Sequence, residues 1–171
     1  MKRILAFLAL TITAGLSAQE YLPDWQAGYL DFHSIATGQG ESTFMMMPDG
    51  TTMLVDAGDV GELWTKVHLP DSSKTPGEWI AHYVRHFSRP LKSSGKVDYF
   101  LLTHFHSDHV GSELKPGSGY FDVLKSVSFD RIIDRGWPSY DFPSYEKNCK
   151  CCKVLERYIS TVKDQVAGPR R

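Results

Sequence analysis

The feature that most constrains this chain is a histidine-rich loop that directly follows a predicted buried strand. Residues 97–103 form a mostly apolar run of strand length, and the chain continues as Thr103-His104-Phe105-His106-Ser107-Asp108-His109-Val110-Gly111. Four side chains that can bind a metal therefore fall within six residues. Imidazole and carboxylate groups suit zinc and neighbouring transition metals. We therefore predict a metal-binding loop at the end of this strand.

The spacing inside this loop predicts how its ligands are shared. His104 and His106 are two residues apart, so their side chains point the same way where the backbone is extended. Asp108 and His109 follow where the chain turns toward a helix, which lets them face a second metal position. Gly111 would permit a close backbone approach at that turn. Two adjacent metals activate water and clamp the attacking and leaving oxygens, so the pattern indicates hydrolysis; a surface loop without metal is the alternative.

The segments before the loop predict three strands and a helix. Residues 29–35, 42–47 and 52–56 have strand character, and the Pro48-Asp49-Gly50 turn joins the second and third as a hairpin. The helix begins at Thr75-Pro76-Gly77-Glu78, which supplies a cap, a proline in the first turn and a capping box. Apolar residues then recur at helical spacing up to Phe87.

The segments after the loop alternate again between helix and strand. We expect a short helix over 121–127, a strand over 131–134, a loop over 137–148 and an amphipathic helix over 154–166. This order predicts a mixed α/β chain, of the α+β type. A length of 171 residues indicates one domain.

The first 18 residues have the pattern of a secretory signal peptide. Lys2 and Arg3 precede an apolar run over 4–12, and small residues follow up to Ala18. The apolar run is too short to span a bilayer comfortably, although an uncleaved anchor is the alternative. We therefore expect a signal peptide over 1–18, a lead-in segment over 19–27 and the folded domain over 28–171. The mature protein would be secreted or periplasmic, with no stable membrane span.

Charge and cysteine content limit the other functions. The net charge of −1 gives no support for a general binder of nucleic acid or acidic membranes, although a local basic groove is compatible with it. Cys149, Cys151 and Cys152 lie together in a chain expected to reach an oxidising compartment. A local disulfide or a partner cysteine explains them better than a metal site, because their spacing is not that of a metal-binding pair.

The loop with the strand before it resembles the signature of the metallo-β-lactamase superfamily. Thr103-His104-x-His106-x-Asp108-His109-x-Gly111 is the metal loop, and Met53-Leu54-Val55-Asp56-Ala57-Gly58 resembles the strand that ends in Asp-x-Gly. Gly38-Gln39-Gly40-Glu41 is similar to the hydrolase domain of ComEC-type competence proteins and their secreted relatives, which usually have Asp where this chain has Glu41. The similarity covers about residues 29–134.

The resemblance implies a site and a fold. His104 and His106 would bind a first zinc, and Asp108 and His109 a second, with iron or manganese as alternative metals. Asp108 would also orient the attacking water, and Asp56 would hydrogen-bond the ligands and hold the loop. The fold would be an αββα sandwich. The superfamily takes further His and Asp ligands from its second half, and no histidine follows His109 here, so we expect this chain to be the N-terminal half only.

The functional expectation is therefore an exported metal-dependent hydrolase, with phosphodiesters or nucleic acid as substrates by analogy. Lactam hydrolysis is a second enzymatic alternative, and a non-catalytic metal-binding module or an inactive remnant is a third. His82 and His86 share a helix face and form a weaker metal pair. Asp134, at a predicted strand end, is a weak candidate for the rim of the site. The sequence gives no oligomeric state.

Overall fold

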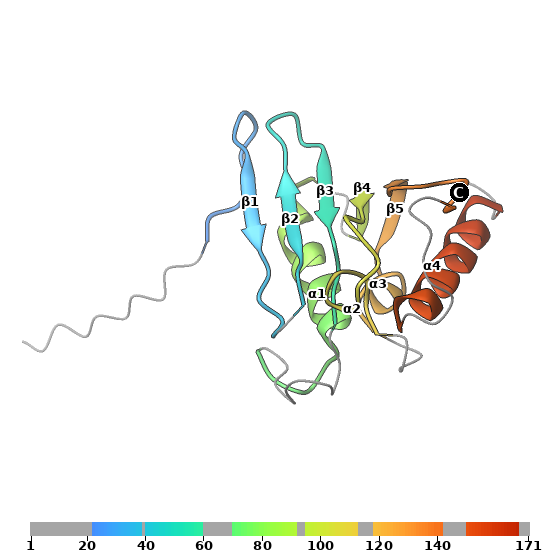
Figure 1. The fold of residues 1–171 in the computed structure, drawn as a ribbon. Helices are drawn as coiled ribbons and strands as arrows, with labels where there is room; N and C mark the ends of the chain where they lie inside the picture. The colour runs from blue at the N-terminus through green and yellow to red at the C-terminus, as the bar shows by residue number, and fades with distance from the viewer. Residues whose placement is uncertain are drawn as a thin grey trace, which may run out of the picture.

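The computed structural model describes residues 22–38, 40–59, 70–91, 95–112, 118–141 and 150–167. In these ranges the chain forms one five-stranded sheet and four α-helices (Figure 1), which confirms the mixed α/β class. The predicted signal peptide and Cys149 lie outside the described residues. None of the described helices is long and apolar enough to cross a bilayer.

The first three strands are antiparallel neighbours: β1 (Asp31–Ser34), β2 (Thr43–Met46) and β3 (Thr52–Val55). At the turn between β2 and β3, the Met47 amide donates to the Thr51 carbonyl over 2.8 Å. The Asp49 carboxylate accepts a bond from the Thr51 amide over 2.9 Å, the usual role of Asp in a turn. The predicted hairpin is confirmed.

Helix α1 (Pro76–Phe87) follows, and it begins where its cap predicts. The Glu78 amide donates to the Thr75 hydroxyl, and the Glu78 carboxylate accepts from the Thr75 amide, so the capping box is complete. A short 3₁₀ turn, η2 (Arg89–Leu91), continues the chain towards the sheet.

The last two strands extend the sheet in parallel. Strands β4 (Lys96–Leu101) and β5 (Ser128–Ile133) complete the order β1-β2-β3-β4-β5, with β3, β4 and β5 parallel. Between them lie α2 (Ser107–Val110) and α3 (Tyr120–Val123). Strand β5 begins earlier than predicted and α3 ends earlier. The carboxyl ends of β3, β4 and β5 share one edge of the sheet, and the histidine loop leaves from there.

Helix α4 (Lys150–Ala167) closes the described chain. It begins earlier than predicted, so that Cys151 and Cys152 fall in its first turn. The Tyr158 ring lies 5.6 Å from the Tyr120 ring of α3 and 5.2 Å from the Phe105 ring of the histidine loop. Through these aromatic contacts α4 packs against both α3 and the histidine loop.

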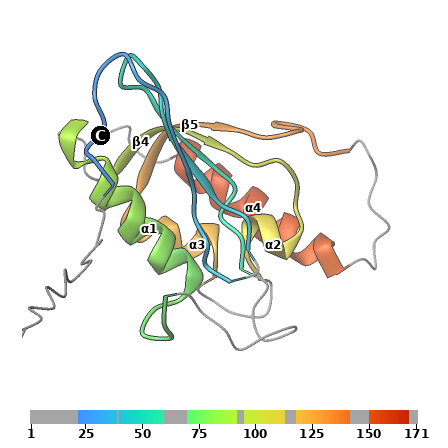
Figure 2. The same cartoon turned by 90° about the vertical axis from the view of Figure 1, so that its left-hand side faces the viewer.

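The two faces of the sheet differ in how far their side chains are buried. Figure 2, which views the sheet from its β1 edge, places α1 and α3 on one side of the strands. On that side one cross-strand row contains Phe44, Leu54 and Phe100, and all three are fully buried. The neighbouring row on the other face comprises Phe32, Met45, Met53 and Tyr99. Phe32 is 64% exposed, and no described helix covers this row.

Candidate metal centre

The histidine loop gathers all four predicted ligands at the carboxyl edge of the sheet. Ligand atoms of His104, His106 and Asp108 lie within 4.8 Å of one another. The His109 ring lies 3.8 Å from the His104 ring, and its Nε2 lies 3.6 Å from an Asp108 oxygen. Three of the four predicted ligands thus form one group that could hold a metal, and His109 lies beside it.

Asp56 lies beneath this group of ligands, at the end of β3. Its carboxylate is nearly inaccessible and accepts three hydrogen bonds: from the Thr103 amide (2.9 Å), the Thr103 hydroxyl (2.7 Å) and His109 Nδ1 (2.8 Å). Asp56 has a φ of 56°, in the left-handed region, which Asp tolerates better than most residues. One buried carboxylate therefore holds both the start of the loop and one of its histidines.

These bonds determine which nitrogen each histidine presents. Because a carboxylate only accepts, His109 carries its proton on Nδ1 and keeps the lone pair of Nε2. The Thr103 hydroxyl donates to Asp56, so it accepts from His104 Nδ1, which lies 3.1 Å away. His104 therefore also presents Nε2. This assignment follows from the hydrogen-bond network, and it leaves both rings ready to bind a metal.

The charge state of His104 also favours metal binding. Burial lowers the pKa of His104 below its ordinary value, and the neighbouring His109 and His106 lower it further, against the opposing carboxylates of Asp56 and Asp108. A neutral imidazole is the form that binds a metal. The site thus favours the ligand form of this ring.

The glycines of the earlier motifs bring the loop into place by close backbone contact. A Cβ on Gly58 would lie 1.7 Å from the Asp108 carbonyl oxygen, so only glycine fits. A Cβ on Gly40 would lie 2.4 Å from the Gly58 carbonyl oxygen. The Glu41 amide donates to the Asp108 carbonyl over 2.7 Å. The Gly-x-Gly and Asp-x-Gly segments therefore form a backbone cradle for the metal loop.

Gly111 ends the loop as expected. Its φ is 112°, and a Cβ there would lie 2.5 Å from the Ser118 carbonyl oxygen. The predicted close backbone approach at this position is confirmed.

Sequence reasoning missed a buried support on the other side of the loop. Asp59 accepts a hydrogen bond from the Ser118 hydroxyl over 2.8 Å, and that hydroxyl accepts one from the Ser112 amide over 2.8 Å. Asp59 and Ser118 are both buried. The residues are distant in sequence and carry no shared motif, so no local signal pointed to them.

Asp134 has a structural position rather than a place among the ligands. One carboxylate oxygen accepts bonds from the Gly136 and Trp137 amides, and the other from the hydroxyls of Tyr140 (2.7 Å) and Tyr158 (2.9 Å). Burial alone would raise the pKa of Asp134, but the four hydrogen bonds outweigh it and hold the pKa below the usual range. Asp134 joins the end of β5 to α4.

His82 and His86 lie on the outer side of α1. Both ring nitrogens of His86 lie close to Arg89 Nη2, at 2.9 and 3.1 Å, and the His82 ring packs edge-on against Trp79. A guanidinium at this distance disfavours a metal cation. Among the described residues, neither histidine belongs to a group of three or more side chains that could hold a metal.

The donor set of the loop fits a divalent transition metal: two imidazoles and a carboxylate within reach of one ion, with a further imidazole beside them. Comparison with models of known families, with curated proteins and with solved structures gave no match. The chemistry of the residues therefore carries the functional argument.

Proposed function

We propose that this protein is a metal-dependent hydrolase of the metallo-β-lactamase fold, with its metal at the histidine loop. The observation that carries the proposal is the convergence of His104, His106 and Asp108 to within 4.8 Å. His109 lies beside them, held by the buried Asp56. A loop built only for structure has no need of three converging ligands, nor of a buried carboxylate that fixes the tautomer of the histidine beside them.

The proposed roles follow from the positions of the side chains. His104 and His106 would bind a first metal, and Asp108 and His109 would bind a second beside it. Zinc is preferred, with iron or manganese as alternatives. A bound zinc supplies a water of lowered pKa and polarises the bond under attack. The Asp108 side chain is 45% exposed, whereas the Asp56 side chain is 6% exposed. Asp108 can therefore reach the attacking water and orient it. Asp56 is buried and instead hydrogen-bonds His109 and Thr103, which positions the ligands.

The uncovered sheet face supports the finer fold proposal. Phe32, Met45, Met53 and Tyr99 form an apolar row that crosses four strands without a covering helix among the described residues. An αββα sandwich places a second sheet over such a face. We propose that the described sheet is the first of the two and that the second half supplies further ligands.

Substrate class and location rest on the sequence. The similarity of residues 38–50 to ComEC-type hydrolase domains favours phosphodiester or nucleic-acid substrates over lactams, by analogy. The pattern of residues 1–18 favours an exported protein. A non-catalytic metal-binding module is the competing proposal from another class.

The test is hydrolysis by the metal-loaded protein. Zinc-loaded and manganese-loaded wild-type protein would be assayed with bis(4-nitrophenyl) phosphate and with a chromogenic cephalosporin. We expect phosphodiester cleavage, which Asp108→Ala lowers at least a hundredfold because the attacking water loses its orienting group. Asp130→Ala is the matched control, since Asp130 is an exposed carboxylate on β5. The control should keep full activity.

The other outcomes decide between the alternatives. Metal binding without hydrolysis of either substrate, in wild type and Asp108→Ala alike, would establish the binding module. Hydrolysis of the cephalosporin alone would identify lactams, and not phosphodiesters, as the substrate class. Elemental analysis of each preparation shows whether metal was present.

A further inference from the structure

Helix α2 carries two of the four candidate ligands, Asp108 and His109, and it is only four residues long. A helix this short makes too few hydrogen bonds to hold its own position, because forming the first turn is unfavourable. Neighbouring segments must therefore position it. The other two ligands, His104 and His106, precede the helix and follow strand β4 closely.

One buried residue, Asp59, connects to both ends of α2. Its amide donates to the carbonyl of Ser107, the first residue of the helix, over 2.9 Å. Its carboxylate accepts a hydrogen bond from the Ser118 hydroxyl over 2.8 Å, and that hydroxyl accepts one from the Ser112 amide over 2.8 Å. Ser112 directly follows Gly111, which caps the end of the helix. The backbone and the side chain of one residue thus hold the start and the end of α2.

The burial of this arrangement makes the Ser118 hydroxyl important. Asp59, Ser112 and Ser118 are all buried. A buried carboxylate or amide that loses its hydrogen-bond partner still bears the cost of its removal from water. The Ser118 hydroxyl is the partner of one such carboxylate and of one such amide, so both depend on it.

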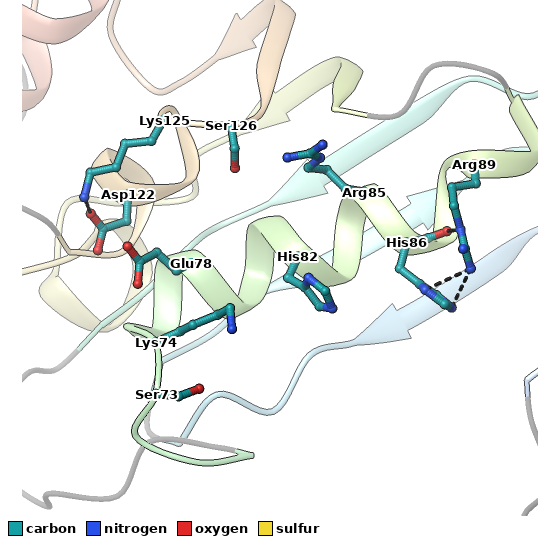
Figure 3. Close-up of a pocket in the computed structure, with 10 residues that line it drawn as sticks. All are labelled: Ser73, Lys74, Glu78, His82, Arg85, His86, Arg89, Asp122, Lys125 and Ser126. Carbon is teal, nitrogen blue, oxygen red and sulfur yellow. Dashed lines mark hydrogen bonds and ion pairs between the residues drawn. The ribbon is translucent and has the colours of Figure 1, made fainter.

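The position of Ser118 comes from the packing of α3 on α1. A Cβ on Gly77 of α1 would lie 2.2 Å from the Gly119 carbonyl oxygen and 2.7 Å from Asp122 Cβ. Figure 3 shows Asp122 beside the start of α1. The Thr75 hydroxyl, which caps α1, donates to the Asp122 carboxylate. The contact between α3 and α1 therefore fixes Ser118 from outside the histidine loop.

We propose that Asp59 and Ser118 are positioning residues for the second metal, because they fix the helix that carries Asp108 and His109. The inference rests on the proposed hydrolase, whose second metal lies at this pair. An Asp108 oxygen and His109 Nε2 lie 3.6 Å apart. Both can therefore bind one zinc at the usual distance of about 2.1 Å, provided that α2 keeps its place.

The first metal position depends on a different support. The buried Asp56 binds the Thr103 hydroxyl and, through it, His104. Loss of the bond between Asp59 and Ser118 should therefore weaken the second metal position and leave the first nearly unchanged. A general loss of stability would instead lower both zinc affinities together.

The test follows the imidazole ¹⁵N signals of His104, His106 and His109 during zinc titration. Ser118→Ala removes the shared hydroxyl with little change in volume. The His109 signal should then need about tenfold more zinc to reach half of its shift, the lower end of the usual cost of losing such support. The signals of His104 and His106 should shift at the same zinc concentration as in wild type.

Ser88→Ala is the matched control, since Ser88 is also a fully buried serine but lies at the C-cap of α1. It should leave all three signals as in wild type. Asp59→Ala should weaken the second position at least as much as Ser118→Ala does. The double variant should be no weaker than Asp59→Ala alone, because both changes remove the same bond. Asp59→Asn, which keeps the size of the side chain, replaces Asp59→Ala where circular dichroism shows the alanine variant unfolded.

Three results would overturn the inference. The first is a His109 signal in Ser118→Ala that shifts at the wild-type zinc concentration. The second is an equal loss at all three histidines in Ser118→Ala. The third is a wild-type chain in which zinc never shifts the His109 signal.

The hydrolase proposal fails in a different way. A protein that shows the expected zinc pattern but cleaves no substrate would contradict hydrolysis and leave the positioning role in place. Hydrolysis by a protein whose His109 signal is unaffected by Ser118→Ala would contradict the positioning role alone.

Discussion

The histidine loop and helix α1 both place histidines at spacings that suit a metal, yet their surroundings differ. In the loop, a buried carboxylate and a threonine hydroxyl hold Nδ1 of His109 and His104, so that Nε2 is presented. On α1, the ring nitrogens of His86 face the guanidinium of Arg89. Sequence spacing alone therefore identifies only candidate metal ligands. The hydrogen-bond partner of the second ring nitrogen distinguishes the candidates that can bind a metal from those that cannot.

The largest expected effect comes from exchanging the ligands themselves. His104→Ala with His106→Ala removes two of three converging donors, so zinc affinity measured by isothermal titration calorimetry should fall by more than about a hundredfold. His82→Ala with His86→Ala is the matched pair on α1 and should leave affinity unchanged. Equal losses of zinc affinity in both pairs would contradict the assignment of the metal site to the histidine loop.

A smaller effect is expected from the support beneath the ligands. Asp56→Asn keeps a side chain that tolerates the left-handed φ but removes the charge that holds His109 and Thr103. Zinc affinity should fall about tenfold to a hundredfold, the usual cost of losing such a partner. The same titration on Asp134→Asn, also a strand-end carboxylate, should give the wild-type affinity. A wild-type affinity for Asp56→Asn would show that Asp56 does not support the metal ligands.

Asp134→Asn should instead affect stability. The folded state holds the pKa of Asp134 below its ordinary value of about 4, so the carboxylate contributes stability above that pH and loses it as pH falls through the folded pKa. Guanidinium unfolding of metal-free protein should show wild type exceeding Asp134→Asn by about 1–2 kcal/mol at pH 7, with the gap narrowing below pH 4. A gap constant from pH 2.5 to 7 would contradict this.

These differences show what the sequence can predict. The hairpin at Asp49 and the start of α1 at Thr75 were predictable because turn and cap chemistry is local. The grouping of His104, His106 and Asp108 was predictable because these residues occupy one short loop. The bond from Asp59 to Ser118 and that from Tyr158 to Asp134 were not, since each joins distant segments through long-range packing. The early start of β5 was missed because its Ser-Phe-Asp-Arg beginning is polar and partly exposed.

The smallest expected effect concerns a third histidine environment. His33 lies under α1 beside Phe87, and its Nδ1 contacts the Tyr83 hydroxyl over 3.0 Å. Burial lowers the pKa of His33, against the opposing charge of Asp31. The unfolded chain therefore takes up a proton first as pH falls below about 6.5, and stability declines from that point. The melting temperature of metal-free His33→Phe should fall less between pH 7 and 5 than that of wild type. An equal fall in both proteins would exclude His33 as a cause of the acid-induced loss of stability.

Zinc titration followed by ¹⁵N NMR of the imidazole side chains would show which histidines bind the metal and through which nitrogen. We expect the signals of His104, His106 and His109 to shift on zinc binding, with Nε2 of His104 and His109 as the coordinating atoms and their Nδ1 protons retained. The signals of His82 and His86 should stay in place. Shifts at His82 and His86, or coordination of His104 and His109 through Nδ1, would contradict a metal centre organised by Asp56 and Thr103.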